Sequence, residues 1–256
     1  MFLLLYPIGV FDSGLGGISV LRALMRKLPN ESFIYFADSE NAPYGCKSDA
    51  EIRELTLVGS KALLALGCKA IVLACNTATS VAVEHLRSIL RVPIVGIEPA
   101  VKPAALAYPN GRILVLATPV TLSHGKYREL LSRIDHKGIV SVEAPRLVEL
   151  VEGGRIDSGD ATEYLEHILS QYRGIRFDAC VLGCTHFPFM KNSIISALGY
   201  QPDFFDGSDG AANRMKSLLQ NNEILAYKNT CRYIGFYNKY CSNIDRMLLY
   251  NKYNPI

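Results

Sequence analysis

The sequence predicts an α/β protein of two similar domains, each with a mostly parallel sheet flanked by helices, and with the active site in the cleft between them. Short, continuously apolar segments alternate with longer segments of helical periodicity. Strands without polar alternation are typical of parallel sheets that helices cover on both faces. Landmarks of the first half of the chain also recur in the second half at a nearly constant offset.

The expected strands are the short apolar segments. In chain order they cover residues 8–11, 33–36, 70–73, 94–97, 113–116, 139–142, 180–182 and 204–205, with one more at 233–237. Between them, apolar residues spaced three and four apart predict helices, for example within residues 20–28, 55–66, 164–169 and 211–219. We also expect a terminal helix after residue 237.

The strongest sign of a duplication is a pair of strands that each end in a cysteine. Residues 70–77 read AIVLACNT and residues 179–186 read ACVLGCTH, so Cys75 and Cys184 lie 109 residues apart. The first strands of the two halves begin 105 residues apart, and Tyr44-Gly45 aligns with Glu152-Gly153 at an offset of 108. These offsets predict two similar half-sites that face one cleft, where small-ligand sites usually form.

The duplication predicts a first domain of residues 1–97 together with 208–256 and a second domain of residues 98–207. The segment that begins near residue 208 is expected to fold back onto the first domain. Parallel sheets place their sites beyond the carboxyl ends of their strands. In this sequence Asp12, Cys75, Thr118 and Cys184 occupy such positions.

Composition and charge argue against several classes of function. A net charge of +3 is too small to indicate binding to nucleic acid or to an anionic membrane. No apolar segment is long enough to span a bilayer, and the apolar first residues lack the features of a signal peptide. Seven cysteines within apolar segments predict reduced thiols in a cytoplasmic protein. We expect no metal site, because no second cysteine pair or nearby histidine couple completes one.

A glycine-rich turn, Asp12-Ser13-Gly14-Leu15-Gly16-Gly17, follows the first strand, and Asp38 ends the next one. Dinucleotide-binding loops place a pyrophosphate on such a turn. The glycine spacing differs here, and the Asp12 carboxylate would repel a phosphate. We therefore expect a tight turn whose N–H groups hold a substrate carboxylate, and a dinucleotide-dependent oxidoreductase is the alternative from another class.

Two thiols that face one carbon from opposite sides can remove a proton from one face and return a proton to the other, which inverts a stereocentre. This chemistry needs no metal, pyridoxal phosphate or nicotinamide. Asp12 is the expected helper of Cys75, and His186, oriented by Glu152, is the expected helper of Cys184. Both cysteines precede helices, whose N-termini lower the pKa of a thiol. Thr77 or Thr79 is expected to cap a helix that begins near Ser80.

These segments resemble the bacterial glutamate racemases of the cofactor-independent aspartate/glutamate racemase superfamily. The matching segments are PIGVFDSGLGG (7–17), AD (37–38), PYG (43–45), ACNTA (74–78), VGIEP (95–99), LVE (150–152) and LGCTHFP (182–188). The resemblance covers residues 7 to about 220, and the departures lie mostly after Tyr237.

The resemblance implies an isomerase that interconverts L- and D-glutamate without a cofactor and supplies D-glutamate for peptidoglycan, usually as a homodimer. It implies that Cys75 deprotonates D-glutamate and that Cys184 deprotonates L-glutamate. The expected catalytic residues are Cys75, Cys184, Asp12, His186 and Glu152. The expected substrate-binding residues, with Thr118 added from its strand end, are Asp12, Ser13, Tyr44, Gly45, Asn76, Thr77, Thr118, Thr185 and His186.

Three further alternatives stay open. Aspartate racemase is the nearest, and His186 favours glutamate because the aspartate enzymes tend to have an acidic residue there. A decarboxylase of the same fold generally uses one cysteine, and this sequence has two in matched positions. A non-catalytic amino-acid-binding protein would share the pocket but would not exchange the Cα proton.

Overall fold

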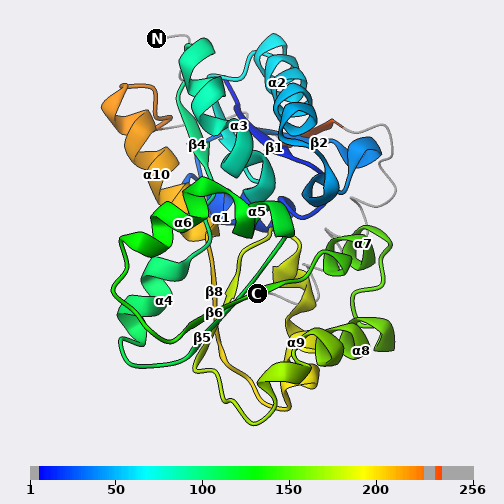
Figure 1. Ribbon diagram of the computed structural model, residues 1–256. Helices are drawn as coiled ribbons and strands as arrows, with labels where there is room; N and C mark the ends of the chain where they lie inside the picture. Colours follow the sequence, from blue (N-terminus) through cyan, green and yellow to red (C-terminus); the bar gives the residue numbers. More distant parts are fainter. Residues whose placement is uncertain (1–5, 228–233, 238–256) are drawn as a thin grey trace.

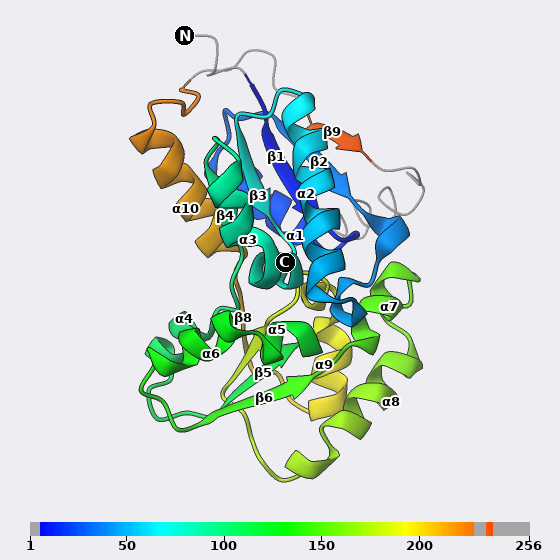
Figure 2. The same cartoon turned by 45° about the horizontal axis from the view of Figure 1, so that its top comes forward.

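The computed structural model describes residues 6–227 and 234–237, and it contains two parallel sheets with helices on their faces (Figures 1 and 2). The first sheet has the strand order β4-β3-β1-β2-β9 and the second has the order β6-β5-β7-β8. This architecture confirms the α/β fold predicted from the sequence. The strands are β1 (Ile8–Asp12), β2 (Phe33–Ala37), β3 (Ala70–Leu73), β4 (Ile94–Gly96), β5 (Ile113–Ala117), β6 (Ile139–Glu143), β7 (Ala179–Leu182), β8 (Asp203–Asp206) and β9 (Ile234–Tyr237).

The two sheets are built on the same plan. In the first sheet β1 pairs in parallel with β2 and β3, and β3 pairs with β4. In the second sheet β5 pairs in parallel with β6 and β7, and β7 pairs with β8. The strand that ends before Cys75, β3, therefore corresponds to the strand that ends before Cys184, β7. The duplication read from the sequence is thus a duplication of strand order.

Burial explains why the central strands have no polar alternation. All five residues of β1 and all five of β5 are buried, because helices cover both faces of each sheet. The helices are α1 (Ile18–Lys27), α2 (Asp49–Ala65), α3 (Asn76–Ile89), α4 (Val101–Ala107), α5 (Pro119–Ser123), α6 (Gly125–Ser132), α7 (Arg146–Glu152), α8 (Gly159–Ile168), α9 (Lys191–Leu198) and α10 (Ser208–Asn221), with short 3₁₀ turns that include η3 (Tyr44–Cys46) and η5 (Phe187–Met190).

One helix start differs from the prediction. Helix α3 begins at Asn76 rather than near Ser80, because the Cys75 sulfur itself caps the helix by accepting from the N–H of Ala78 at 3.4 Å. The two threonines expected to cap it have other partners: Thr79 donates to the carbonyl of Leu73, and Thr77 contacts Thr118. The candidate thiol therefore lies at the very N-terminus of the helix.

The segment after residue 207 returns to the first sheet. Helix α10 packs against α1, and β9 pairs in parallel with the outer edge of β2 (Figure 2). The return is fixed by a fully buried ion pair of 2.7 Å between Lys69 and Glu31. Lys69 also donates to the carbonyl of Ile224, and Glu31 accepts from the N–H of Ala226. The terminal helix expected after residue 237 lies outside the described residues.

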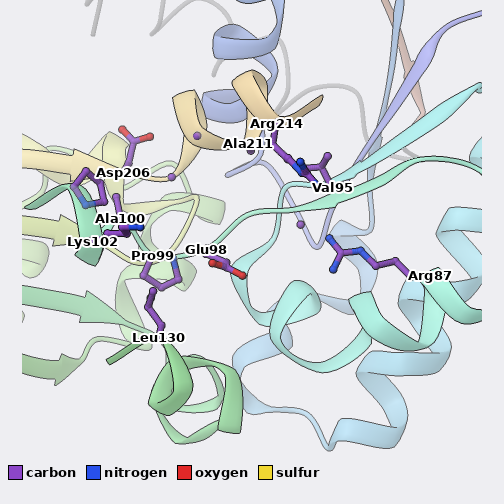
Figure 3. Close-up of a pocket in the computed structure, with 14 residues that line it drawn as sticks. Arg87, Val95, Glu98, Pro99, Ala100, Lys102, Leu130, Asp206, Ala211 and Arg214 are labelled. Carbon is purple, nitrogen blue, oxygen red and sulfur yellow. The ribbon is translucent and has the colours of Figure 1, made fainter. Parts of the chain in front are cut away.

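The chain crosses between the sheets twice, after β4 and after β8. The two crossings touch, because a Cβ on Gly207 would overlap the carbonyl oxygen of Glu98. Together they line a cavity of about 380 Å³ (Figure 3). Charged side chains of both signs surround this cavity, and none of the candidate site residues lines it; its charged residues are Arg87, Glu98, Lys102, Asp206 and Arg214.

Among residues 6–227 and 234–237, no helix is both long enough and apolar enough to cross a bilayer.

Candidate active site

The first candidate thiol, Cys75, is buried between a helix N-terminus and the turn after β1. Its sulfur lies 3.4 Å from the hydroxyl oxygen of Ser13 and accepts from the N–H of Ala78. Burial, with a smaller contribution from the nearby Asp12 carboxylate, raises the pKa of Cys75 to about 12, against the opposing effects of these two hydrogen bonds. The pKa is therefore raised rather than lowered, contrary to the expectation from the helix N-terminus, because desolvation outweighs the helix.

The second candidate thiol, Cys184, lies beside an imidazole. Nδ1 of His186 is 3.6 Å from the Cys184 sulfur, and Nε2 of His186 is 2.6 Å from Oε1 of Glu152. Burial lowers the pKa of His186, but its hydrogen bonds with Cys184 and Glu152 raise it, and the net pKa is well above the ordinary value. His186 thus lies between the Glu152 carboxylate and the Cys184 sulfur, and the role of Glu152 in orienting it stays a prediction.

Asp12 ends β1 between the two thiols and is fully buried. Its Oδ1 accepts from the N–H of Gly14 at 2.9 Å, and its Oδ2 accepts from the hydroxyl of Thr185 at 3.1 Å. Burial raises the pKa of Asp12 to about 6, although the charge of His186 and the Gly14 N–H both lower it. The expected pairing of Asp12 with Cys75 is thus electrostatic, and its side-chain hydrogen bond goes to the residue that follows Cys184.

Asn76 carries the clearest sign of a ligand. Its side chain is 3% exposed, yet neither its amide oxygen nor its amide nitrogen has a hydrogen-bond partner. A buried amide without partners costs free energy, so such a group is usually completed by a molecule that binds there. Asn76 also directly follows Cys75 in the sequence, so the residue with the unpaired amide is the neighbour of the candidate thiol.

Three threonine hydroxyls connect the two halves of the protein on the Cys75 side. The hydroxyl oxygen of Thr77, in α3, lies 2.9 Å from that of Thr118, which caps α5. Thr121 completes the cluster at 2.9 Å from Thr118. The sequence analysis missed Thr121, although its spacing of three from an N-capping threonine is the signal that identifies it.

The 3₁₀ turn with Tyr44 and Gly45 lies against Thr118. A Cβ on Gly45 would lie 3.0 Å from the Cβ of Thr118, so any other residue at this position would make a tight contact with Thr118. The hydroxyl of Tyr44 donates to Asp38 at 2.6 Å, and burial together with this bond raises the pKa of Tyr44 well above its usual value. Tyr44 thus positions the loop through its contact with Asp38, a partner that the sequence analysis did not assign.

Most of the candidate residues lie at or directly after strand ends, at the boundary between the two sheets. Tyr44 and Gly45 come from η3, which packs against α5, and Glu152 comes from the end of α7. The polar groups that surround the thiols are carboxylates, hydroxyls, an amide and one imidazole. The described residues contain no group of three or more His, Cys, Asp or Glu side chains arranged to hold a metal ion.

Comparison with known proteins identifies similar chains and folds. The model of the family described as Asp/Glu/Hydantoin racemase matches residues 8–215. The chain is 43% identical over 220 residues to a glutamate racemase of Clostridium perfringens, covering 85% of each chain. It is 46% identical over 221 residues to a glutamate racemase of Clostridium acetobutylicum, covering 86% of each.

A solved structure has the same fold. The structure of Escherichia coli glutamate racemase in complex with L-glutamate and the activator UDP-MurNAc-ala superposes with a TM-score of 0.82 at 30% identity, covering 96% of this chain and 95% of that one.

Proposed function

Because the chain belongs to the Asp/Glu/Hydantoin racemase family, we propose that it is a glutamate racemase, an isomerase that interconverts L- and D-glutamate without a cofactor. The observation that carries the proposal is the pair of buried thiols at the ends of the equivalent strands β3 and β7. The relatives at 43% and 46% identity are glutamate racemases, which supports glutamate over aspartate as the substrate.

In the proposed reaction each thiol serves one face of the substrate. Nδ1 of His186 takes the proton of Cys184, and the thiolate then removes the Cα proton of L-glutamate. The Cys75 thiol returns a proton to the opposite face, which gives D-glutamate and leaves Cys75 as thiolate and Cys184 as thiol. The reverse reaction starts from that state, so one proton enters and one leaves in each turnover.

The raised pKa of Cys75 suits its role as the proton donor. When Cys75 acts as the base, its thiolate must be stabilised by another group. An ammonium group brought in by the substrate would supply that help, because an opposite charge within about 4–6 Å favours the ionised form of a thiol. Asp12 lies near Cys75 and is the natural partner of such an ammonium group. Substrate binding would thereby lower the pKa of the thiol that must act on it.

Neutral donors would hold the substrate carboxylates. Asn76 has both amide atoms without a hydrogen-bond partner in a buried position, and the hydroxyls of Thr77 and Thr118 lie 2.9 Å from each other on the Cys75 side. Hydrogen bonds from such preorganised donors stabilise the negative charge that develops when the Cα proton leaves, and removal of one donor typically costs about 2.7–4 kcal/mol.

The oxidoreductase alternative fits the structure poorly. The N–H of Leu15, within the glycine-rich turn, already donates to the carboxylate of Glu152 at 2.7 Å. A pyrophosphate on this turn would have to displace that carboxylate and approach the buried Asp12. Saturable binding of NAD(H), measured by fluorescence, would support the alternative, and we expect none.

Circular dichroism with L-glutamate and L-aspartate tests the proposal. We expect L-glutamate to lose its signal faster, and faster turnover of L-aspartate would overturn the choice of substrate. In D₂O, the product formed from either enantiomer should carry deuterium at Cα, and a product without solvent deuterium would contradict two-thiol proton transfer. An amino-acid-binding protein would bind glutamate in calorimetry without any change in the circular dichroism signal.

We further propose a cytoplasmic location, where the protein would supply D-glutamate for peptidoglycan synthesis. A homodimer is the proposed assembly. Light scattering coupled to size-exclusion chromatography tests the assembly, and a monomeric mass would contradict it. Depletion of the protein in cells should be rescued by added D-glutamate.

A further inference from the structure

The glycine-rich turn after β1 joins the two halves of the protein at the second thiol. The N–H of Leu15 donates to Oε1 of Glu152 at 2.7 Å, and the same oxygen lies 2.6 Å from Nε2 of His186. Leu15 follows a strand of the first sheet, whereas Glu152 ends α7 and His186 follows β7, both in the second half. One carboxylate oxygen therefore connects the backbone of the first half to the imidazole of the second half.

Glycine on either side of Leu15 makes this contact possible. A Cβ on Gly14 would overlap Oε1 of Glu152. A Cβ on Gly16 would lie 2.5 Å from Nδ1 of His186 and 2.6 Å from the hydroxyl oxygen of Thr185. Real Cβ atoms do not approach other atoms so closely, so the two glycines let the turn lie directly against the carboxylate and the imidazole.

We propose, on the basis of the two-thiol function above, that the turn Gly14-Leu15-Gly16 couples closure of the two halves to activation of Cys184. While the halves are closed, the Leu15 N–H holds the Glu152 carboxylate against His186. The carboxylate then fixes the proton on Nε2 and leaves Nδ1 facing the Cys184 sulfur. When the halves separate, Glu152 loses this donor, and the thiol loses an oriented acceptor for its proton.

Charge and burial support this coupling. Hydrogen bonds to an ionised carboxylate are about twice as strong as neutral ones, so the Leu15 N–H is an effective anchor. The Glu152 side chain is 18% exposed, whereas the His186 side chain is 2% exposed. The carboxylate is therefore the partly exposed member of this pair, and the Leu15 N–H is the hydrogen bond that it accepts from the first half. Glu152 and Gly14 are in this sense positioning residues, because they act on the thiol through His186.

The two thiols differ in whether their hydrogen-bond partners belong to one half of the protein or to both. The hydrogen bonds of Cys75 are to Ser13 and Ala78, which both belong to the first half. The hydrogen-bond chain of Cys184 runs through His186 and Glu152 into the opposite half. Loss of the Leu15 contact is therefore expected to slow proton transfer at Cys184 more than at Cys75.

Gly14→Ala tests the proposal through isotope effects rather than through rates alone. Racemisation has an equilibrium constant of one, so kcat/KM is equal in the two directions and does not show which thiol is slowed. We expect kcat/KM to fall about ten- to a hundredfold, less than the roughly 10²–10⁴-fold that a general acid or base contributes, because His186 itself stays in place. The deuterium isotope effect on kcat/KM should rise for L-[2-²H]glutamate, whose deuteron goes to Cys184, and fall for the D enantiomer.

Leu15→Ala is the matched control, because it removes the buried side chain but keeps the backbone N–H. It should leave the ratio of the two isotope effects unchanged. For Gly14→Ala, isotope effects that change in parallel, or that rise only for D-glutamate, would overturn the proposal. Wild-type protein that fails to racemise glutamate would overturn the proposed function instead.

Hydrogen exchange gives a second test that does not depend on how well Gly14→Ala folds. The Leu15 amide should exchange at least about tenfold faster in Glu152→Ala than in the wild-type protein, since a hydrogen bond to a charged group is stronger than one between neutral groups. The amide of Val10 in β1 serves as the reference and should not change. Equal protection of Leu15 in both proteins would show that the contact with Glu152 does not hold the turn.

Discussion

The hydroxyl of Thr185 donates to Oδ2 of Asp12 at 3.1 Å, and so connects the residue after Cys184 to the residue that ends β1 in the opposite half. The other carboxylate oxygen of Asp12 accepts from the N–H of Gly14. Asp12 is fully buried, and two hydrogen bonds do not replace the water that an ionised carboxylate loses. The pKa of Asp12 is raised because this loss of hydration disfavours the ionised form.

Replacement of Asp12 by Asn should therefore stabilise the protein at neutral pH while it lowers racemisation. Burial raises the pKa of Asp12 from 3.8 to about 6, so the native state binds more protons than the unfolded state between these pH values. Stability consequently falls as the pH rises through this window. A shift of about two units corresponds to about 3 kcal/mol. Urea unfolding should show that Asp12→Asn gains about 1–3 kcal/mol at pH 7.5 and little at pH 4; an equal gain at both pH values would contradict the assignment.

Cys75→Ser and Cys184→Ser should each lower kcat for racemisation by about 10²–10⁴-fold, because a serine hydroxyl is a much weaker acid and base than a thiol. Glutamate binding, measured by calorimetry, should stay detectable in both variants. Cys46→Ser is the matched control, because Cys46 is exposed and is not among the candidate catalytic or substrate-binding residues. It should racemise like the wild-type protein, and wild-type rates in both site variants would exclude the two-thiol mechanism.

Asn76→Ala should weaken glutamate binding without loss of stability. The side chain of Asn76 makes no hydrogen bond within the protein, so its removal breaks none. A lost hydrogen bond to a charged substrate group costs about 1.5–3 kcal/mol, or about ten- to a hundredfold in Kd. Calorimetry measures the affinity and thermal unfolding measures the stability. A lower Tm with unchanged affinity would indicate a structural role instead.

Gly207→Ala and Gly210→Ala are expected to change the free energy of unfolding in opposite directions. A Cβ on Gly207 would overlap the carbonyl of Glu98, where the two crossings touch, and this clash should cost about 1–3 kcal/mol. A Cβ on Gly210 meets nothing within 4 Å and lies inside α10, so alanine should stabilise the helix by about 1 kcal/mol. Urea unfolding of both variants checks the signs. A neutral Gly207→Ala would mean that the crossings separate freely.

Lys69→Met should be among the most destabilising single changes outside the site. It leaves Glu31 buried without its partner, and breaking a buried ion pair costs about 3–5 kcal/mol. Arg26→Met is the control, because the Arg26–Asp209 pair is more than half exposed and should contribute less than about 1 kcal/mol. Comparable losses in the two variants, measured by urea unfolding, would contradict the role assigned to burial.

The strands could be predicted because most are continuous apolar segments, and the observed boundaries differ from the predicted ones by at most one residue at either end. The start of α3 could not be predicted, because its cap is the sulfur of Cys75, and cysteine is not among the usual N-cap residues. The contacts of Asp12 with Thr185 and of Leu15 with Glu152 join residues more than 130 positions apart. No local pattern encodes them. The raised pKa of Cys75 likewise depends on burial, which arises only in the folded protein.

The pairing of β9 with β2 also has a consequence for synthesis of the chain. Phe33 and Ile234 are partners in the first sheet although about 200 residues separate them. At about 5–20 residues per second, a ribosome needs about 10–40 seconds to deliver the missing strand. During that time the second sheet can form completely, whereas the outer edge of β2 stays open. An open edge is a template for strands of other chains, so the nascent protein is most prone to aggregation in this interval.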